Sequence, residues 1–252
     1  MADGGSRRPA ARAGTTALAV VLVLSLVFAQ TFGLRDQQPN LRTRSRSLFT
    51  HMVGVKPYDA CIPKTHGLYS PLSQGTLHHV FDRGWMWVIP FNNHPTSTNR
   101  LVSVGLNLDI DHHPRTGLPP EEEFRQFISR YPSIAEQFKD ATAAQPWMSS
   151  DQLQFSSQTA VGERFCMLPH AFGFVDPLFS SGLGVTMFAI NAIAVRLIRA
   201  ATDGDYSAER FAYVDTWTKK NIDFYDRLVS GAYLSFTDFA LWNAWHRLWM
   251  IG

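Results

Sequence analysis

A short loop of small residues leads directly into an apolar helix, and it is the strongest chemical signal in the sequence. The stretch is FVDPLFSSGLGVTM, residues 174–187. The first N–H groups of a helix lack intrahelical acceptors and carry partial positive charge, so an anion or phosphate is favoured there. Gly182 and Gly184 allow a ligand to approach the backbone, and Ser180 or Ser181 could cap the helix or donate to a ligand. An ordinary serine-capped helix start is the alternative.

Two tryptophans one residue apart form the second feature. In the stretch GWMWVIPF, Trp85 and Trp87 share one face of a strand while Met86 and Val88 share the other, because successive side chains alternate. Both faces of this strand are therefore expected to be covered. A strand packed between two layers would explain the pattern without any chemistry, because aromatic side chains usually bury their area in cores.

Other residue groups give weaker signals. His78-His79 and the segment 109–113 do not supply the separated ligands of a metal site, and we expect these histidines at the surface or at strand ends. No metal is therefore predicted. The formal net charge of +2 gives no reason to expect a nucleic-acid partner.

The elements that position these residues are strands in the first half of the chain. Strands are expected at residues 47–55 and within 76–91, and residues 92–99 should turn the tryptophan strand into an antiparallel hairpin with 100–109. The basic stretch before the first strand is expected to be a solvated loop; it contains Arg42, Arg44 and Arg46.

Helices are expected after these strands. Residues 116–132 and a short segment opening at Ser133, with Glu136 completing a capping box, have helix-start signals. Residues 183–202 form a helix too uniformly apolar for the surface, so it should be buried. Residues 207–252 should form one long and one shorter helix.

The N-terminus has the layout of a signal peptide, with a basic start and an apolar run at residues 17–29. This run is shorter than the ~20 residues that a spanning helix needs, so a membrane anchor is the second choice. A third interpretation, which we favour, is that these residues are not the natural start of the domain and arise from translation in another frame.

Both chemical features resemble one family. WMWVIP fits the Trp-x-Trp-x-Ile-Pro pattern of the flavin-dependent halogenases, and FVDPLFSSG resembles their Asp-Pro…Ser-Gly flavin and halide loop. The flanking stretches RSLFTHMVGVKPYDAC and FALWNAWHRLW are also similar to that family. The resemblance covers residues 32–252 and implies a mixed α+β or α/β fold, part of the class-A flavin monooxygenase-like, FAD/NAD(P)-binding architecture of tryptophan halogenase-like enzymes.

The resemblance implies a chemistry and a set of residues for it. A separate reductase would supply reduced FAD, which with oxygen oxidises chloride or bromide to hypohalous acid. The acid would travel through a tunnel to an electron-rich aromatic such as a phenol or pyrrole, free or carrier-bound. The implied tunnel wall is Trp85, Trp87 and Pro90, the implied halide ligands are Ser181 and Gly182, and the implied cofactor contacts are Asp176, Pro177, Ser180 and Leu183.

Several positions depart from the family pattern. Phe179 stands where the tryptophan-specific branch has a glutamate, which argues against tryptophan as substrate, and Pro169-His170 replaces a Gly-Asp pair that holds the cofactor in many FAD enzymes. No Gly-x-Gly-x-x-Gly occurs in the chain. The family's reactive lysine matches none of this chain's lysines, which are Lys56, Lys64, Lys139, Lys219 and Lys220. These departures predict an incomplete chain that is inactive alone and binds FAD weakly.

The sequence therefore divides into four predicted parts. They are an apolar segment at 1–33, a substrate-binding β-rich region at 34–160, the second flavin and halide motif with its buried helix at 161–202, and a C-terminal helical region at 203–252. A flavin-dependent monooxygenase or hydroxylase is one alternative function. A non-catalytic small-molecule-binding module, membrane-tethered or exported, is another. We expect a cytoplasmic protein, unless residues 17–29 are a genuine leader or anchor.

Overall fold

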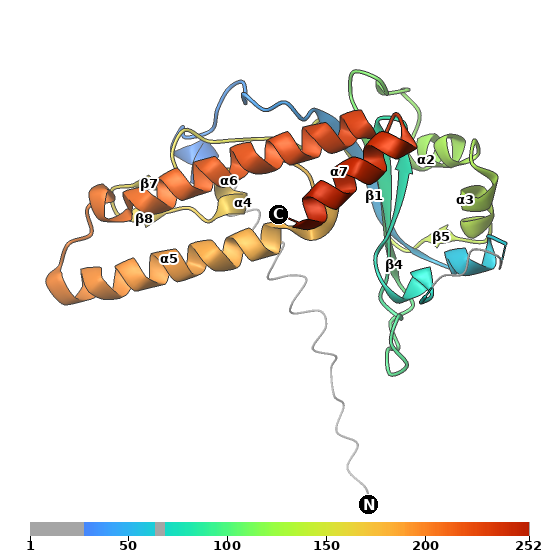
Figure 1. Cartoon of the computed structure of the whole chain (residues 1–252), viewed down its shortest axis with the longest axis horizontal. Helices are drawn as coiled ribbons and strands as arrows, with labels where there is room; N and C mark the ends of the chain where they lie inside the picture. The colour runs from blue at the N-terminus through green and yellow to red at the C-terminus, as the bar shows by residue number, and fades with distance from the viewer. Residues whose placement is uncertain (1–27, 64–68, 252) are drawn as a thin grey trace, which may run out of the picture. The chain divides into compact units, whose positions relative to one another are not determined.

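The computed structural model describes residues 28–63 and 69–251 (Figure 1). The predicted apolar segment therefore lies almost entirely outside the described residues. The chain forms two compact units. One combines the chain up to Leu41 with Gln154–Asp226 and is called here the helical unit; the other combines Arg42–Leu153 with Arg227–Gly252 and is called the sheet unit.

The sheet unit is built on a six-stranded antiparallel sheet in the order β2-β3-β4-β1-β5, with β6 also paired to β1. The strands are β1 (Ser45–Val53), β2 (Leu77–Phe81), β3 (Gly84–Pro90), β4 (Val102–Asp109), β5 (Thr142–Ala143) and β6 (Met148–Ser150). The predicted hairpin between the tryptophan strand and the strand after it is confirmed as β3 and β4, since Trp85 pairs with Asn107 and Trp87 with Gly105.

One face of this sheet carries the main hydrophobic core. Helices α2 (Pro120–Ile128) and α3 (Pro132–Gln137) cover it, and the short helices η1 (Tyr58–Ala60) and η3 (Leu72–Gln74) lie in the segment between β1 and β2. Met86, Leu106, Phe124 and Phe138 are fully buried there. Helix α7 (Phe239–Ile251) also belongs to the sheet unit, where the Trp245 indole packs on Gly231 and donates to the Leu228 carbonyl at 3.1 Å.

Strand β1 begins two residues earlier than expected, and this corrects the interpretation of the basic stretch. Arg46 is buried within the strand, with its Nη2 2.6 Å from Glu123 Oε1 and its Nε 2.7 Å from the His113 carbonyl. A guanidinium can leave water only where such partners satisfy it. The expectation of a solvated loop was therefore wrong for Arg46, whereas Arg42 and Arg44 are exposed.

The helical unit contains the small hairpin β7 (Val161–Gly162) and β8 (Phe165–Cys166), then α4 (Pro169–Phe172), η4 (Leu178–Ser180), α5 (Gly182–Asp203) and the first part of α6 (Ala208–Ser235). Helix α6 crosses the boundary between the two units at Asp226. Helices α5 and α6 run side by side (Figure 1), with the Arg196 guanidinium 4.5 Å from the centre of the Tyr213 ring.

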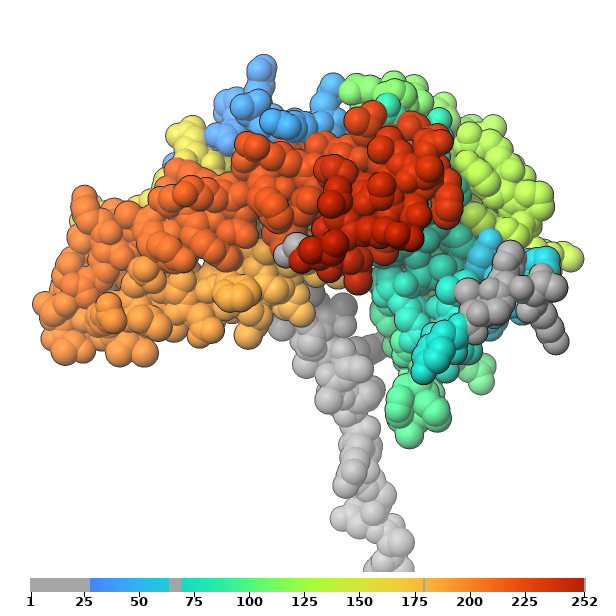
Figure 2. Space-filling view, in the orientation of Figure 1, coloured from blue at the N-terminus to red at the C-terminus, as the bar shows by residue number. Residues whose placement is uncertain are grey.

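Helix α5 is not the buried element that its composition predicts. Leu183, Phe188 and Ile198 are 72%, 69% and 69% exposed, and the space-filling view shows the helix at the surface (Figure 2). Within the described residues it is the one helix long and apolar enough to cross a membrane, with only 17% of its most apolar window buried. The expectation of a buried helix was therefore wrong, because uniform apolarity does not by itself place a covering surface over a helix.

Candidate functional site

The two tryptophans lie on the same face of the sheet, and this is the face that α2 and α3 do not cover. Their ring centroids are 5.7 Å apart and the planes make an angle of 48°. Trp85 is 1% exposed, and its indole N–H donates to the Tyr233 hydroxyl on α6 at 3.1 Å. Trp87 is half-buried and donates to Ser103 Oγ at 3.1 Å. Each indole therefore has a fixed orientation, because its donor has a defined acceptor.

Gly105 is the residue that allows Trp87 to lie flat on the sheet. It stands opposite Trp87 in the register of β3 and β4. A Cβ atom at this position would lie 1.9 Å from Cζ2 of the Trp87 ring, far inside van der Waals contact. Any side chain other than hydrogen would therefore displace the indole.

The tryptophan face also holds buried polar atoms that lack a partner. Asn107 pairs with Trp85 on β3 and with Ser47 on β1, so the three side chains are neighbours on one face. Asn107 is 0% and Ser47 1% exposed. Within the described part of the chain, no group bonds to either polar side-chain atom of Asn107 or to the Ser47 hydroxyl. Such atoms commonly hold an ordered water or the polar group of a ligand.

Pro90 is placed differently from the two indoles. It pairs with Val102, and the alternation of β3 directs it to the core face with Met86 and Val88. It lines a cavity on that face. The structure thus brings Trp85 and Trp87 together and sets Pro90 on the other side of the same strand.

The serine and glycine loop of the helical unit forms a tight turn at the start of α5. Asp176 Oδ1 accepts from the Leu178 N–H at 3.0 Å, and the Pro177 carbonyl accepts from the Ser180 N–H at 3.0 Å. Ser180 has a φ of +55°, a conformation that non-glycine residues rarely adopt and that clusters at functional sites. Ser181 occupies the N-cap position without a side-chain hydrogen bond to the helix.

The first turn of α5 therefore has no serine cap, which decides against the ordinary capped start. The backbone N–H groups of that turn point out of the helix and favour an anion. Leu183, 72% exposed, adds an apolar surface next to them. A halide and the edge of a planar ring are two ligands that this combination of N–H groups and apolar surface suits.

The His170 side chain packs against the start of α5. A Cβ atom on Gly182 would lie 2.3 Å from His170 Nε2, so the imidazole occupies the space that a side chain at position 182 would need. His170 Nδ1 lies 3.3 Å from Thr186 Oγ1. Burial lowers the pKa of His170, which keeps the ring neutral at physiological pH. The sequence marked Pro169-His170 only as a departure, and no local signal indicated this packing.

The candidate residues fall into two sets, one in each unit. Trp85, Trp87 and Pro90 belong to the sheet unit. Asp176, Pro177, Ser180, Ser181, Gly182 and Leu183 belong to the helical unit. Residues 28–63 and 69–251 hold no group of three or more His, Cys, Asp or Glu side chains suited to a metal. His79 is 7% exposed, so the expectation of a surface histidine was wrong there.

Known proteins align with the chain across both sets. It is 51% identical over 224 residues to the monodechloroaminopyrrolnitrin halogenase PrnC of Pseudomonas fluorescens, a match that covers 89% of this chain and 39% of the relative. It is 45% identical to the tetracycline 7-halogenase of Kitasatospora aureofaciens, covering 88% of this chain and 40% of that protein. A match of such length includes both the tryptophan strand and the loop before α5.

The chain belongs to the flavin-dependent halogenase family. The crystal structure of halogenase PltM in complex with phloroglucinol and FAD has a TM-score of 0.85 and 41% sequence identity, covering 88% of this chain and 45% of that one. No family model matches the chain. The chain spans about 40% of the length of the curated halogenases that it matches.

Family membership identifies the loop before α5 as the place to test for FAD. The exposed Leu183, the uncapped N–H groups of α5 and the glycine at position 182 fit a flavin ring and a halide. The ADP half of FAD needs a strand-turn-helix with Gly-x-Gly-x-x-Gly, which this sequence lacks. Sequence reasoning missed Gly105, Asn107 and His170, because their roles depend on contacts across strands or between helices.

Proposed function

We propose that this chain is the part of an FAD-dependent halogenase that contributes the tryptophan-bearing sheet and the halide loop. The observation that carries the proposal is the 51% identity that extends over both motifs. The uncapped start of α5 supports it on physical grounds, since a halide is an anion. The fold would be the corresponding part of a class-A flavin monooxygenase-like architecture, with residues 34–160, 161–202 and 203–252 as its substrate, flavin-halide and C-terminal regions.

The residues of the loop would bind and orient. The backbone N–H groups of Ser181 and Gly182 would hold chloride or bromide, and Leu183 would lie against the flavin ring. Asp176, Pro177 and Ser180 would shape the turn beside the cofactor. Bound reduced FAD would supply, with oxygen, the oxidising equivalent that converts the halide to hypohalous acid.

Trp85, Trp87 and Pro90 would separate the organic substrate from the flavin. Their strand would then prevent direct hydroxylation and leave the hypohalous acid as the reagent that reaches the substrate. The fixed indoles suit this role, because both N–H groups are satisfied within the sheet unit. The catalytic lysine of the family has no counterpart that we recognise in this chain.

The substrate would be an electron-rich aromatic such as a phenol or a pyrrole, free or carrier-bound. Phe179 supports this choice, since the tryptophan-specific branch has a glutamate at that position. Phenols and pyrroles attack an electrophilic halogen without such help. The relatives support the same class, because PltM has been crystallised with phloroglucinol and another relative is a 1H-pyrrole-2-carbonyl-[peptidyl-carrier protein] chlorinase.

A separate flavin reductase would deliver the reduced cofactor, and the protein would act in the cytoplasm. Alone, the chain should bind FAD weakly and should not turn over. A fluorescence titration of FAD tests this part of the proposal. Saturable binding at micromolar FAD would contradict the expected weak binding and would show that the ADP half of the cofactor also has a site in this chain.

A chimaera tests the function itself. Residues 28–251 would replace the matching segment of PltM, and the product formed from phloroglucinol with reduced FAD, oxygen and chloride would be measured. A Trp87→Ala variant of the chimaera should give altered products or more free hydrogen peroxide, with PltM itself as the control. An unchanged halogenation yield and specificity would remove the wall role of Trp87.

A further inference from the structure

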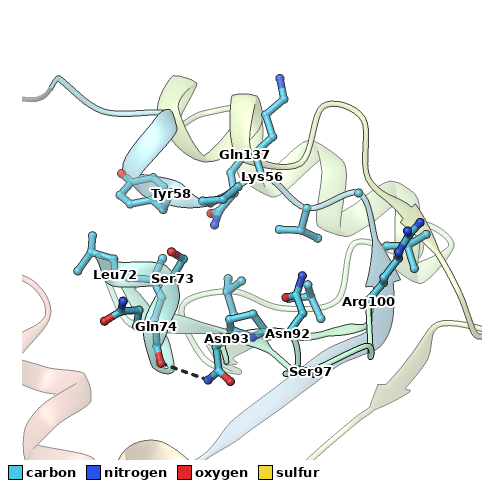
Figure 3. A pocket seen from close by; sticks show the side chains of 18 of the residues that line it. Lys56, Tyr58, Leu72, Ser73, Gln74, Asn92, Asn93, Ser97, Arg100 and Gln137 are labelled. Atoms are coloured by element: carbon cyan, nitrogen blue, oxygen red, sulfur yellow. Dashed lines mark hydrogen bonds between the residues drawn. The ribbon is translucent and has the colours of Figure 1, made fainter. Parts of the chain in front are cut away.

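A large cavity lies on the core face of the sheet unit, on the opposite side of β3 from the two indoles. Its volume is about 940 Å³, at the upper end of the range for small-molecule sites. The end of β1, η1, η3, α3 and the loop between β3 and β4 surround it (Figure 3). Leu77, Val88 and Val102 continue the hydrophobic core into the cavity and give it an apolar floor.

Gln137 supplies a buried donor to this cavity. Its side chain is 2% exposed, and its Oε1 lies 2.9 Å from Nε2 of His79. An amide oxygen only accepts hydrogen bonds, so His79 Nε2 must carry the proton, and the Gln137 NH₂ group is left for another acceptor. Among residues 28–63 and 69–251 nothing accepts a hydrogen bond from this NH₂ group. Figure 3 shows the Gln137 amide at the cavity wall.

His79 holds Gln137 in this orientation without adding charge. Burial lowers the pKa of His79 to about 4, so the imidazole is neutral at physiological pH. The Tyr58 ring packs edge-on against it with centroids 4.6 Å apart, and the Tyr58 hydroxyl is bound to Ser133 Oγ at 2.9 Å. The amide is thus preorganised to donate into the cavity before a ligand arrives.

The side chains that line the cavity include basic residues and no acidic ones. Lys56 is neutralised by Glu136 and Asp140 at 2.5 and 3.2 Å, and its ammonium points away from the cavity (Figure 3). Arg100, at the opposite end, is exposed and forms no ion pair within the described part of the chain. An exposed guanidinium next to an apolar floor favours a ligand with an anionic group.

We propose that this cavity binds a small aromatic acid, with its ring on the apolar floor, an acceptor oxygen at the Gln137 NH₂ group and its carboxylate at Arg100. The site is distinct from the proposed halide loop, because it lies on the core face and uses none of the halide-loop residues; with the proposed tunnel wall it shares only Pro90. It is therefore testable on the purified 252-residue chain without flavin.

Calorimetric titration with 6-hydroxy-2-naphthoate, whose hydroxyl oxygen lies at the far end of the ring from the carboxylate and is the acceptor for Gln137, measures this binding. Uncharged 6-(hydroxymethyl)-2-naphthol is the matched probe. We expect saturable naphthoate binding that Arg100→Gln weakens about fivefold, with little effect on the uncharged probe. Arg115→Gln removes a guanidinium outside the cavity and should change neither affinity. No saturable binding of naphthoate, or equal affinity in wild type and Arg100→Gln, would overturn the proposal.

A second variant tests the donor. Gln137→Met keeps the length of the side chain and removes the NH₂ group, so it should weaken both probes. Because it also removes the acceptor of His79, its folding is checked by circular dichroism before titration. Undiminished binding of both probes to a folded Gln137→Met variant would also contradict the site. The Arg100 comparison stands alone if this variant does not fold.

Discussion

Replacing Gly105 by alanine should displace the Trp87 indole and destabilise the sheet unit. The new Cβ would lie 1.9 Å from Cζ2 of the ring, whereas carbon atoms in contact are about 3.5–4.0 Å apart, so the ring must move by about 2 Å. Overpacking of this kind costs about 1–3 kcal/mol, and loss of the bond from Trp87 Nε1 to Ser103 Oγ adds about 1 kcal/mol. We expect the free energy of unfolding to fall by about 2–4 kcal/mol.

A double-mutant cycle measured by urea unfolding tests this reasoning. In a Trp87→Ala background the clash is absent, so Gly105→Ala should cost far less, and the coupling energy should be about 2 kcal/mol or more. Gly75→Ala is the matched control, because a methyl group on that glycine would meet no atom within 4 Å and its φ is negative. Costs of Gly105→Ala that agree within about 0.5 kcal/mol in both backgrounds would refute the contact.

Three further outcomes are expected. Tyr233→Phe removes the acceptor of the buried Trp85 N–H and should lower the free energy of unfolding by about 1–3 kcal/mol in urea titrations; no loss would mean that another group accepts this bond. Gly182→Ala should shift the His170 ring resonances in NMR spectra and destabilise the helical unit. Gly184→Ala is the control and should do neither, because its new methyl group meets no atom within 4 Å. Equal shifts and equal losses of stability in the two variants would contradict the packing of His170 against the start of α5. Burial lowers the pKa of His79 from 6.5 to about 4. Between these two pH values the unfolded chain binds more protons than the folded chain. The contribution of His79 to the free energy of unfolding should therefore be complete above pH 6.5 and decrease by about 3 kcal/mol as the pH falls through 4. An NMR titration in which His79 protonates near 6.5 would show that it is not buried.

The strand arrangement around the tryptophans could be predicted because its signal is local. A period of two along β3 determines which residues share a face, and the polar turn at 92–99 determines that β4 returns antiparallel to it. Gly105 and Asn107 could not be assigned roles in the same way. Their meaning depends on the residue opposite them in the register, which the sequence of one strand does not show.

Two sequence-based predictions were wrong because the side chains concerned bind partners far away in the sequence. Arg46 lies in the same basic stretch as the exposed Arg44, and its burial depends on partners more than 60 positions later, the Glu123 carboxylate and the carbonyls of His113 and Pro114. The predicted capping box also failed, since Ser133 Oγ bonds to the Tyr58 hydroxyl and Glu136 to Lys56, each across the fold. Polar side chains with two possible partners cannot be assigned from spacing alone.

The sequence predicted where the candidate site lies, but not which contacts hold its residues in place. The small residues before α5 indicated a ligand-accessible helix start, and the structure adds the absence of a serine cap and the imidazole of His170 beneath Gly182. Helix α5 itself was assigned to the interior because nearly every face is apolar. Composition predicted a buried helix, whereas Leu183, Phe188 and Ile198 are largely exposed in the structure.

The mass of the product made by the PltM chimaera, in chloride buffer and in halide-free buffer, tests the central claim most directly. If this chain supplies the tryptophan-bearing sheet and the halide loop of a halogenase, phloroglucinol gains chlorine in the first buffer and is unchanged in the second. A hydroxylated product that does not depend on chloride, or hydrogen peroxide alone from a chimaera that binds FAD while PltM chlorinates, would contradict the account.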